Sequence, residues 1–205
     1  MTNAAFWDRI APKYAKQPIS NVDAYEDTLA RVQTYLGTET VALELGCGTG
    51  STALRLQPDT ARYVAADISK GMIDIANDKI ADQTGPTPEF RVAGVDAAAF
   101  SGGPFNTVLA FNLLHLVPDL DAALKVIHDN LPEGGVLISK TPAIAGKWYY
   151  RPLIKTMQLF GKAPPVLYLT VDEIDARIAA AGFRIVETGL YPPSTPSRFV
   201  VARKV

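Results

Sequence analysis

Short apolar segments alternate with helical segments through most of this chain, and that alternation limits the chain to one fold class. Five segments of four or five residues are apolar with little polar alternation, as in strands that are buried on both faces; they cover residues 41–45, 63–66, 90–93, 107–111 and 136–140. Helical patterns lie between them at residues 51–56, 70–82 and 120–131. Such alternation forms parallel strands with helices on both faces of a sheet. The sequence therefore predicts an α/β domain.

The C-terminal part predicts two strands without a helix between them. A helix over residues 170–181 has Thr170 as N-cap and Glu173 three residues later, which is the pattern of a capping box, and Gly182 follows at its end. Residues 183–189 and 198–203 then predict two strands joined by a connection with prolines at 192, 193 and 196. Strands joined without a crossover helix pair antiparallel. We expect one domain over residues 1–205.

Two regions fall outside the alternating pattern. Residues 1–37 predict one or two helices before the first strand, and four apolar or aromatic side chains share one helix face there: Phe6, Trp7, Ile10 and Tyr14. That face is either a packing stripe or part of a lid over a binding site. Residues 142–169 follow the fifth strand and are rich in aromatic residues and prolines, so we expect an insertion that lines a pocket.

Composition and charge exclude several classes of protein. Twenty basic residues against twenty-one acidic residues leave a net charge of −1, whereas a protein that grips a phosphate backbone shows a basic excess, so no nucleic-acid partner is expected. Cys47 is the only cysteine, which favours a reducing, cytoplasmic location. The first ten residues do not form a secretory signal, and no apolar stretch approaches the ~20 residues of a membrane helix. No cluster has metal-ligand spacing, so no metal is expected.

The strongest local signal is the glycine-rich segment ELGCGTG, residues 44–50, between the first strand and the helix that follows. The dinucleotide fingerprint G-x-G-x-x-G fails at its last position, which is Ser51, and the Gly-Lys-Ser/Thr end of a P-loop is missing. Instead Glu44 stands two residues before the first glycine. A carboxylate there repels phosphate and attracts a cation, such as a ligand with an amino group and a sulfonium.

In this order the motifs resemble those of class I S-adenosylmethionine-dependent methyltransferases, especially the small bacterial-type enzymes of quinone biosynthesis and other small-molecule methylation. The likeness covers roughly residues 40–140. It implies a Rossmann-like seven-stranded sheet, mostly parallel with an antiparallel C-terminal hairpin strand, and S-adenosyl-L-methionine as cofactor with S-adenosyl-L-homocysteine as product. The chain departs from the family at Asn106, where an Asp is usual, and at residues 131–135, which read LPEGG rather than L-x-P-G-G.

The resemblance implies cofactor contacts for thirteen residues. The methionine part is held by the glycine loop, and Asp67, which ends the second strand, binds the ribose hydroxyls. Apolar side chains and an Asp after the third strand hold the adenine, while backbone after the fourth strand lies near the methyl group and an aromatic side chain closes over the cofactor. The full set is Glu44, Gly46, Cys47, Gly48, Gly50, Asp67, Ile68, Met72, Asp96, Ala97, Asn112, Leu113 and Tyr14.

Several of these residues also have a structural interpretation. Glu44 can cap the following turn, Asp67 can cap the helix that begins at Lys70, and Asp96 can be an ordinary polar loop residue. Cys47 is interpreted as a small residue rather than a reactive thiol, because its sequence neighbours supply no base or cation.

The acceptor side of the site is predicted from residues near the same edge of the sheet. His115 follows the fourth strand and is a candidate general base, or a support for the loop. Trp7, Trp148, Tyr149 and Tyr150 are candidate substrate contacts, since an aromatic wall suits an aromatic or lipid-like acceptor. We expect in-line methyl transfer to a small-molecule or lipid-like acceptor. The alternatives are a catalytically silent methyltransferase-like binding protein and a dinucleotide-dependent oxidoreductase.

Overall fold

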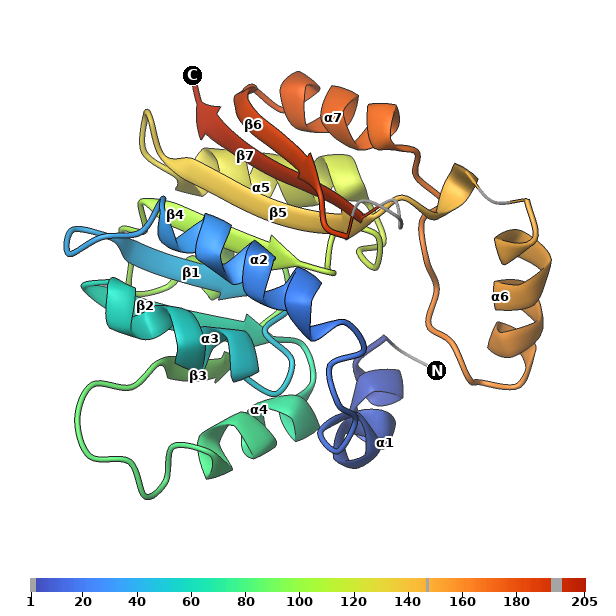
Figure 1. Ribbon diagram of the computed structural model, residues 1–205, viewed down its shortest axis with the longest axis horizontal. Coiled ribbons are helices and arrows are strands. Elements are labelled where there is room, and N and C mark those ends of the chain that lie inside the picture. The colour runs from blue at the N-terminus through green and yellow to red at the C-terminus, as the bar shows by residue number, and fades with distance from the viewer. Residues whose placement is uncertain (1–2, 147, 193–196) are drawn as a thin grey trace.

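The computed structural model describes residues 3–146, 148–192 and 197–205, and its centre is a seven-stranded sheet. The strand order is β3-β2-β1-β4-β5-β7-β6 (Figure 1). All pairs are parallel except those of β7, which is antiparallel to both β5 and β6. The fold class predicted from the sequence is thereby confirmed. The strands are β1 (Val41–Leu45), β2 (Arg62–Asp67), β3 (Glu89–Val92), β4 (Thr107–Phe111), β5 (Val136–Pro142), β6 (Phe183–Leu190) and β7 (Ser197–Lys204).

Helices cover both faces of the sheet because its central strands are apolar on both sides. On one face, α5 (Leu120–Asn130) and α7 (Val171–Ala180) pack against Leu43, Val64 and Leu137. On the other, α2 (Val22–Gln33), α3 (Ser51–Leu56) and α4 (Lys70–Asp78) pack against Ala42, Leu109 and Ile138. Two buried clusters therefore hold the sheet between two helical layers.

The local signals set most of the element ends. Thr170 and Glu173 form the predicted capping box at the start of α7, and Gly182 has a φ of +91° just beyond its end. The helix predicted over residues 70–82 ends instead at Asp78, because beyond it only Ile80 continues the apolar spacing. Residues 193–196 of the predicted proline-rich connection lie outside the described residues.

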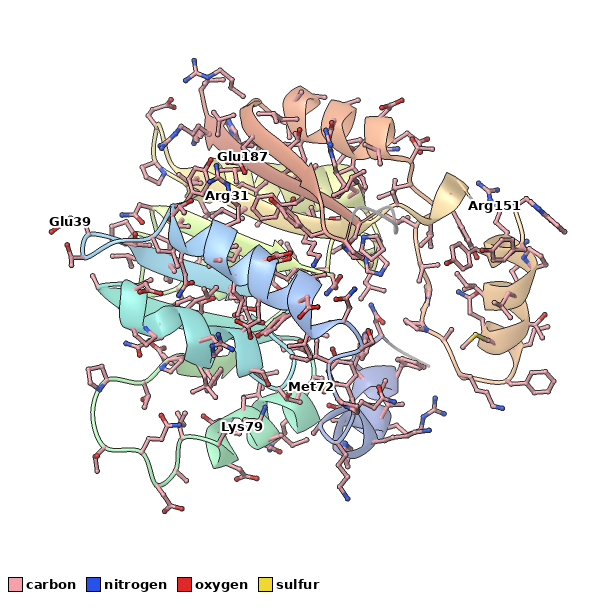
Figure 2. The ribbon with its side chains drawn as sticks, viewed as in Figure 1. Arg31, Glu39, Met72, Lys79, Arg151 and Glu187 are labelled. Carbon is pink, nitrogen blue, oxygen red and sulfur yellow. The ribbon has the colours of Figure 1, made fainter. Side chains whose placement is uncertain are left out.

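Charged side chains line both edge strands of the sheet. At the β3 edge, Glu89 lies between Arg62 and Arg91, with N–O distances of 2.8 and 2.7 Å. At the β6 edge, Glu187 forms an ion pair with Arg31 of α2 and accepts a hydrogen bond from Tyr35 (Figure 2 labels Arg31 and Glu187). Helix α2 is thus joined to β6, the strand at this edge of the sheet.

The remaining helices lie at the end of the sheet where the parallel strands finish. These are α1 (Asn3–Tyr14) and α6 (Tyr150–Leu159), both near the right-hand end of Figure 1. Ligands of open α/β sheets bind outside the carboxyl ends of the strands, so α1 and α6 flank the expected site. Within the described residues, no helix combines the length and the apolar character needed to span a bilayer.

Candidate cofactor site

Three glycines shape the loop between β1 and α3. Gly46, Gly48 and Gly50 have φ values of +69°, +55° and +76°, which only glycine adopts without cost. A Cβ on Gly46 would lie 2.8 Å from Leu113 Cδ1, whereas a Cβ on Gly48 would meet nothing closer than Tyr14 Cε1 at 3.9 Å. The loop is therefore closely packed at Gly46, whereas at Gly48 a Cβ would only come into van der Waals contact with Tyr14.

Asp67 joins the end of β2 to this loop. One carboxylate oxygen accepts a hydrogen bond from Gly48 N at 2.9 Å, and the other accepts from Ser69 N at 2.9 Å. The side chain is buried; burial raises the pKa of Asp67, and the two backbone N–H donors oppose that shift. A buried carboxylate thus stands where a ribose is expected, already oriented by backbone donors.

Glu44 lies inside the sheet layer rather than at the mouth of the loop. Its side chain is fully buried, and its Oε2 accepts a hydrogen bond from Tyr63 OH at 2.9 Å. Burial raises the pKa of Glu44 to about 7; the Tyr63 hydrogen bond opposes the shift, and the charge of Asp67 adds to it. Because its partner is a phenol and not a backbone N–H, the capping interpretation has no support.

The raised pKa of Glu44 makes protein stability depend on pH. Between pH 4.5 and about 7 the folded state binds more protons than the unfolded state, so the free energy of unfolding falls as pH rises. Because Glu44→Gln removes the ionisation, the free energy of unfolding of this variant relative to the native protein should rise by about 3 kcal/mol from pH 5 to pH 8. Urea unfolding at both pH values measures the change. Glu26→Gln, at an exposed ion pair, should show no comparable rise.

Lys79 supports the loop from behind and was not predicted. Its Nζ donates to Thr49 O, Thr49 Oγ1 and Ser51 Oγ at 2.6, 3.1 and 2.9 Å (Figure 2 shows Lys79 on the α4 side). The sequence neighbours of Cys47 supply no cation, but Lys79, distant in sequence, acts to lower the pKa of that thiol. Burial nevertheless dominates and raises the Cys47 pKa, which keeps the thiol protonated and unreactive.

Helix α1 is fastened to the start of α4 by Asp8, a second residue that sequence reasoning missed. Its Oδ1 accepts from Ser69 Oγ at 2.7 Å and from Gly71 N at 2.9 Å, and these hydrogen bonds lower the pKa of Asp8. Tyr14, the last residue of α1, reaches the glycine loop. The Trp7 ring packs edge-on against the Tyr14 ring, with their centroids 6.3 Å apart. The aromatic face thus lies beside the loop, as a lid would.

Loss of the Asp8 contact should loosen α1. In Asp8→Ala the two hydrogen bonds to the start of α4 are gone, so trypsin should cut the segment with Arg9, Lys13 and Lys16 about tenfold faster. Timed proteolysis followed by mass spectrometry measures the rate. Asp23→Ala, in the first turn of α2, is the matched control and should leave cleavage unchanged. Equal rates in all three proteins would show that Asp8 does not hold α1.

The residues predicted around the adenine fall into two groups. Ile68 is 43% exposed directly after Asp67, and Asp96 and Ala97 are also exposed. Asp96 Oδ1 accepts from Ala98 N at 2.9 Å and caps a short 3-10 helix at Ala97–Phe100. Met72, in contrast, is fully buried on α4. The exposed group is accessible to a ligand, whereas Met72 belongs to the protein interior.

Backbone strain marks the turn after β4. Asn112 has a φ of +53°, the only positive φ of a non-glycine residue in the described ranges, and its N–H donates to Lys140 O at 2.7 Å. Such a conformation costs ~1–2 kcal/mol and is found most often at functional sites. Leu113, the next residue, contacts Gly46. The turn after β4 therefore packs against the glycine loop through Leu113.

His115 is neutral at physiological pH. Burial lowers its pKa to about 4, and its Nδ1 is buried with no hydrogen-bond partner within the described structure. Its carbonyl accepts from Leu167 N at 2.7 Å, which holds the segment after α6 beside the turn. A neutral imidazole accepts a hydrogen bond but is a weak base.

The aromatic residues at the start of α6 form a chain of ring contacts, two of them exposed. Trp148 is 84% exposed and Tyr149 43% exposed, and the rings at 148, 149 and 150 pack mainly on one another. Figure 1 shows α6 standing away from the sheet. The described residues also contain no group of three His, Cys, Asp or Glu that could hold a metal ion.

Comparison with known proteins finds similarity to methyltransferases. Residues 43–137 match the methyltransferase domain family. A ubiquinone biosynthesis O-methyltransferase of Parvibaculum lavamentivorans is 29% identical over 75% of this chain and 63% of its own length. A malonyl-[acyl-carrier protein] O-methyltransferase of Geobacter sulfurreducens is 30% identical over 71% of this chain and 56% of its own length. The chain thus spans about three fifths of these relatives.

The fold is shared with solved enzymes. The structure of magnesium protoporphyrin IX methyltransferase from Synechocystis PCC 6803 with bound SAH aligns with a TM-score of 0.70 at 21% identity, over 98% of this chain and 94% of that one. At that identity the likeness establishes the fold.

Proposed function

We propose that this protein is an S-adenosylmethionine-dependent methyltransferase, because residues 43–137 match the methyltransferase domain family and the chain shares the fold of a solved methyltransferase. The acceptor is proposed to be a small or lipid-like molecule. One observation carries the proposal: a loop of three positive-φ glycines is joined to the buried carboxylate of Asp67 at the carboxyl edge of the sheet.

The residues at this edge fit the cofactor. Gly48 leaves room for a ligand close to the backbone, and the carboxylate of Asp67 beside it suits a cation better than a pyrophosphate. Asp67 would hold the ribose hydroxyls, and the exposed side chains of Ile68 and Tyr14 would cover the adenine and the methionine part. When bound, the cofactor supplies an electrophilic methyl group on a good neutral leaving group.

The chain itself supplies orientation and exclusion of water. The side chain of Leu113 lies against the loop, and with the neighbouring backbone of Asn112 it would fix the direction of approach; such positioning is worth up to ~7–11 kcal/mol. His115, neutral and unpaired at Nδ1, would accept a hydrogen bond from an acceptor hydroxyl or amine. As part of the same proposal, the protein acts in the cytoplasm, on the support of its single cysteine.

Calorimetry tests the proposal directly. S-adenosylhomocysteine and S-adenosylmethionine should both bind the purified protein, and NADH should not. Transfer of a labelled methyl group to a panel of phenols, amines and amphiphilic acceptors then separates an enzyme from a silent binding protein. Failure of both adenosyl ligands to bind would refute the assignment.

A further inference from the structure

Helix α6 and its flanks carry several large apolar side chains that are exposed on the surface of the protein. None of the described residues of α6 is buried, and Figure 1 shows the helix projecting from the body of the protein. A group of exposed apolar side chains on this scale marks a binding surface. We call it the α6 surface; its members are Trp148, Tyr149, Leu153, Met157, Leu159 and Phe160, with exposed fractions of 84%, 43%, 52%, 37%, 85% and 72%.

The apolar side chains of the α6 surface do not form a single narrow stripe. Tyr149, Leu153, Met157 and Phe160 follow one another at steps of four, four and three residues and so share one side of the helix. Trp148 and Leu159 adjoin the ends of this run, and adjacent helical positions point about 100° apart. A rigid groove on a protein partner would bury a single stripe of apolar side chains. A fluid lipid bilayer can bury apolar side chains that point in several directions.

The charges within residues 134–171, the stretch that contains α6, have one sign, and Glu173 of α7 lies near enough to Arg151 for their charges to interact. No acidic residue occurs between Glu133 and Asp172, although the whole chain has a net charge of −1. The same stretch contains Arg151, Lys155 and Lys162, and all three are exposed. Figure 2 places Arg151 on α6, where its guanidinium lies 5.0 Å from the Tyr168 ring centroid.

The α6 surface is tied to the lid of the cofactor site. Arg9 of α1 donates a hydrogen bond to the carbonyl of Gly161, just after α6. Two more exposed basic residues, Lys13 and Lys16, lie at the end of α1. The basic and apolar groups are therefore at the same edge of the molecule as the glycine loop.

We propose that the α6 surface binds the face of an anionic lipid bilayer. Helices with Trp, Phe and Leu on one side and Lys or Arg on the other lie in the plane of the bilayer interface, and each basic residue near an anionic surface strengthens binding about fivefold. Docking of α6 turns the edge with the cofactor site toward the lipid. If the proposed function holds, the acceptor is an amphiphile that enters the site from the membrane.

Sedimentation with lipid vesicles tests this proposal. The full chain should bind vesicles of phosphatidylcholine mixed with phosphatidylglycerol at least about tenfold more strongly than vesicles of phosphatidylcholine alone, and high salt should abolish the difference. In a Trp7→Phe variant, the emission of Trp148 should shift to shorter wavelength on anionic vesicles only.

Two double variants separate the apolar and the charged contributions. Leu159→Ser/Phe160→Ser and Lys155→Glu/Lys162→Glu should each lose at least about tenfold in vesicle binding. The matched controls change exposed residues outside the α6 surface. Val186→Ser/Val205→Ser matches the apolar variant, Lys125→Glu/Arg184→Glu matches the charge variant, and both should bind vesicles as the native protein does.

The proposal is overturned if vesicles do not bind, if both vesicle types bind equally, or if the α6 variants bind like their controls. It is also overturned if light scattering shows a dimer that only the α6 variants disrupt, or if the α6 variants lose binding to nucleic acid or to an acidic carrier protein but not to vesicles.

Calorimetry with S-adenosylhomocysteine is independent of lipid. Cofactor binding without vesicle binding refutes this inference alone, and vesicle binding without cofactor binding refutes the proposed function alone.

Discussion

Replacement of Gly46 by alanine should abolish cofactor binding while the protein stays folded. The new Cβ would lie 2.8 Å from Leu113 Cδ1 and 3.3 Å from Leu113 Cβ, at a φ of +69°. Either the loop or the turn after β4 must move, and both are proposed to touch the cofactor. We expect the affinity for S-adenosylhomocysteine, measured by calorimetry, to fall more than about 100-fold, because every contact along the methionine part depends on this loop.

Gly134→Ala is the matched control for that experiment. Gly134 has nearly the same φ, +74°, but a Cβ there would meet nothing within 4 Å, and it lies in the turn before β5. Both variants should lose the ~1–2 kcal/mol of stability that a left-handed alanine costs. Only Gly46→Ala should lose the cofactor. Equal affinities in the two variants would show that the loop does not hold the ligand.

Replacement of Asp67 by asparagine should weaken cofactor binding about 100-fold. The carboxylate accepts from Gly48 N and Ser69 N, and an amide keeps only one acceptor oxygen. Hydrogen bonds to charged groups are worth about 1.5–3 kcal/mol each, so loss of the paired acceptance of two ribose hydroxyls accounts for that factor. A titration with S-adenosylhomocysteine and with 2′-deoxy and 3′-deoxy analogues measures it.

The deoxy analogues show whether the effect lies at the ribose. Each should bind the native protein more weakly than the parent ligand and lose less affinity in Asp67→Asn, because one of the two hydroxyl interactions is already missing. Asp74→Asn, at an exposed ion pair with Lys70 on α4, is the control and should bind like the native protein. If Asp67→Asn weakens the deoxy analogues as much as the parent ligand, Asp67 is acting on the loop and not on the ribose.

Local patterns in the sequence were enough to predict the fold. The ranges 41–45, 51–56 and 107–111 were predicted with the ends that β1, α3 and β4 have, because each is a run of one periodicity bounded by glycine or polar residues. The capping box at Thr170 is likewise a signal contained within four residues. The resemblance to methyltransferases then implied seven strands with an antiparallel C-terminal hairpin strand, whereas the strand order came from the structure alone.

The contacts that shape the site joined residues far apart in the sequence and were harder to predict. Asp8 reaches Ser69 and Lys79 reaches Thr49 through helix packing that no short-range pattern encodes. Glu44 was placed at the mouth of the loop from its spacing alone, but strand pairing puts it beside Tyr63 in the interior. The assignments of individual residues to the cofactor and acceptor stay predictions.

The ion pairs at the two sheet edges limit how copies of this protein can meet. A strand added beside β3 would have to displace Glu89 from Arg62 and Arg91, and one added beside β6 would have to displace Glu187 from Arg31. Each of these partly exposed pairs is worth at most about 1 kcal/mol, but charged side chains along an edge strand disfavour its pairing with a second chain. Growth of the sheet from chain to chain is thereby discouraged, and the protein is protected against fibre formation along this direction.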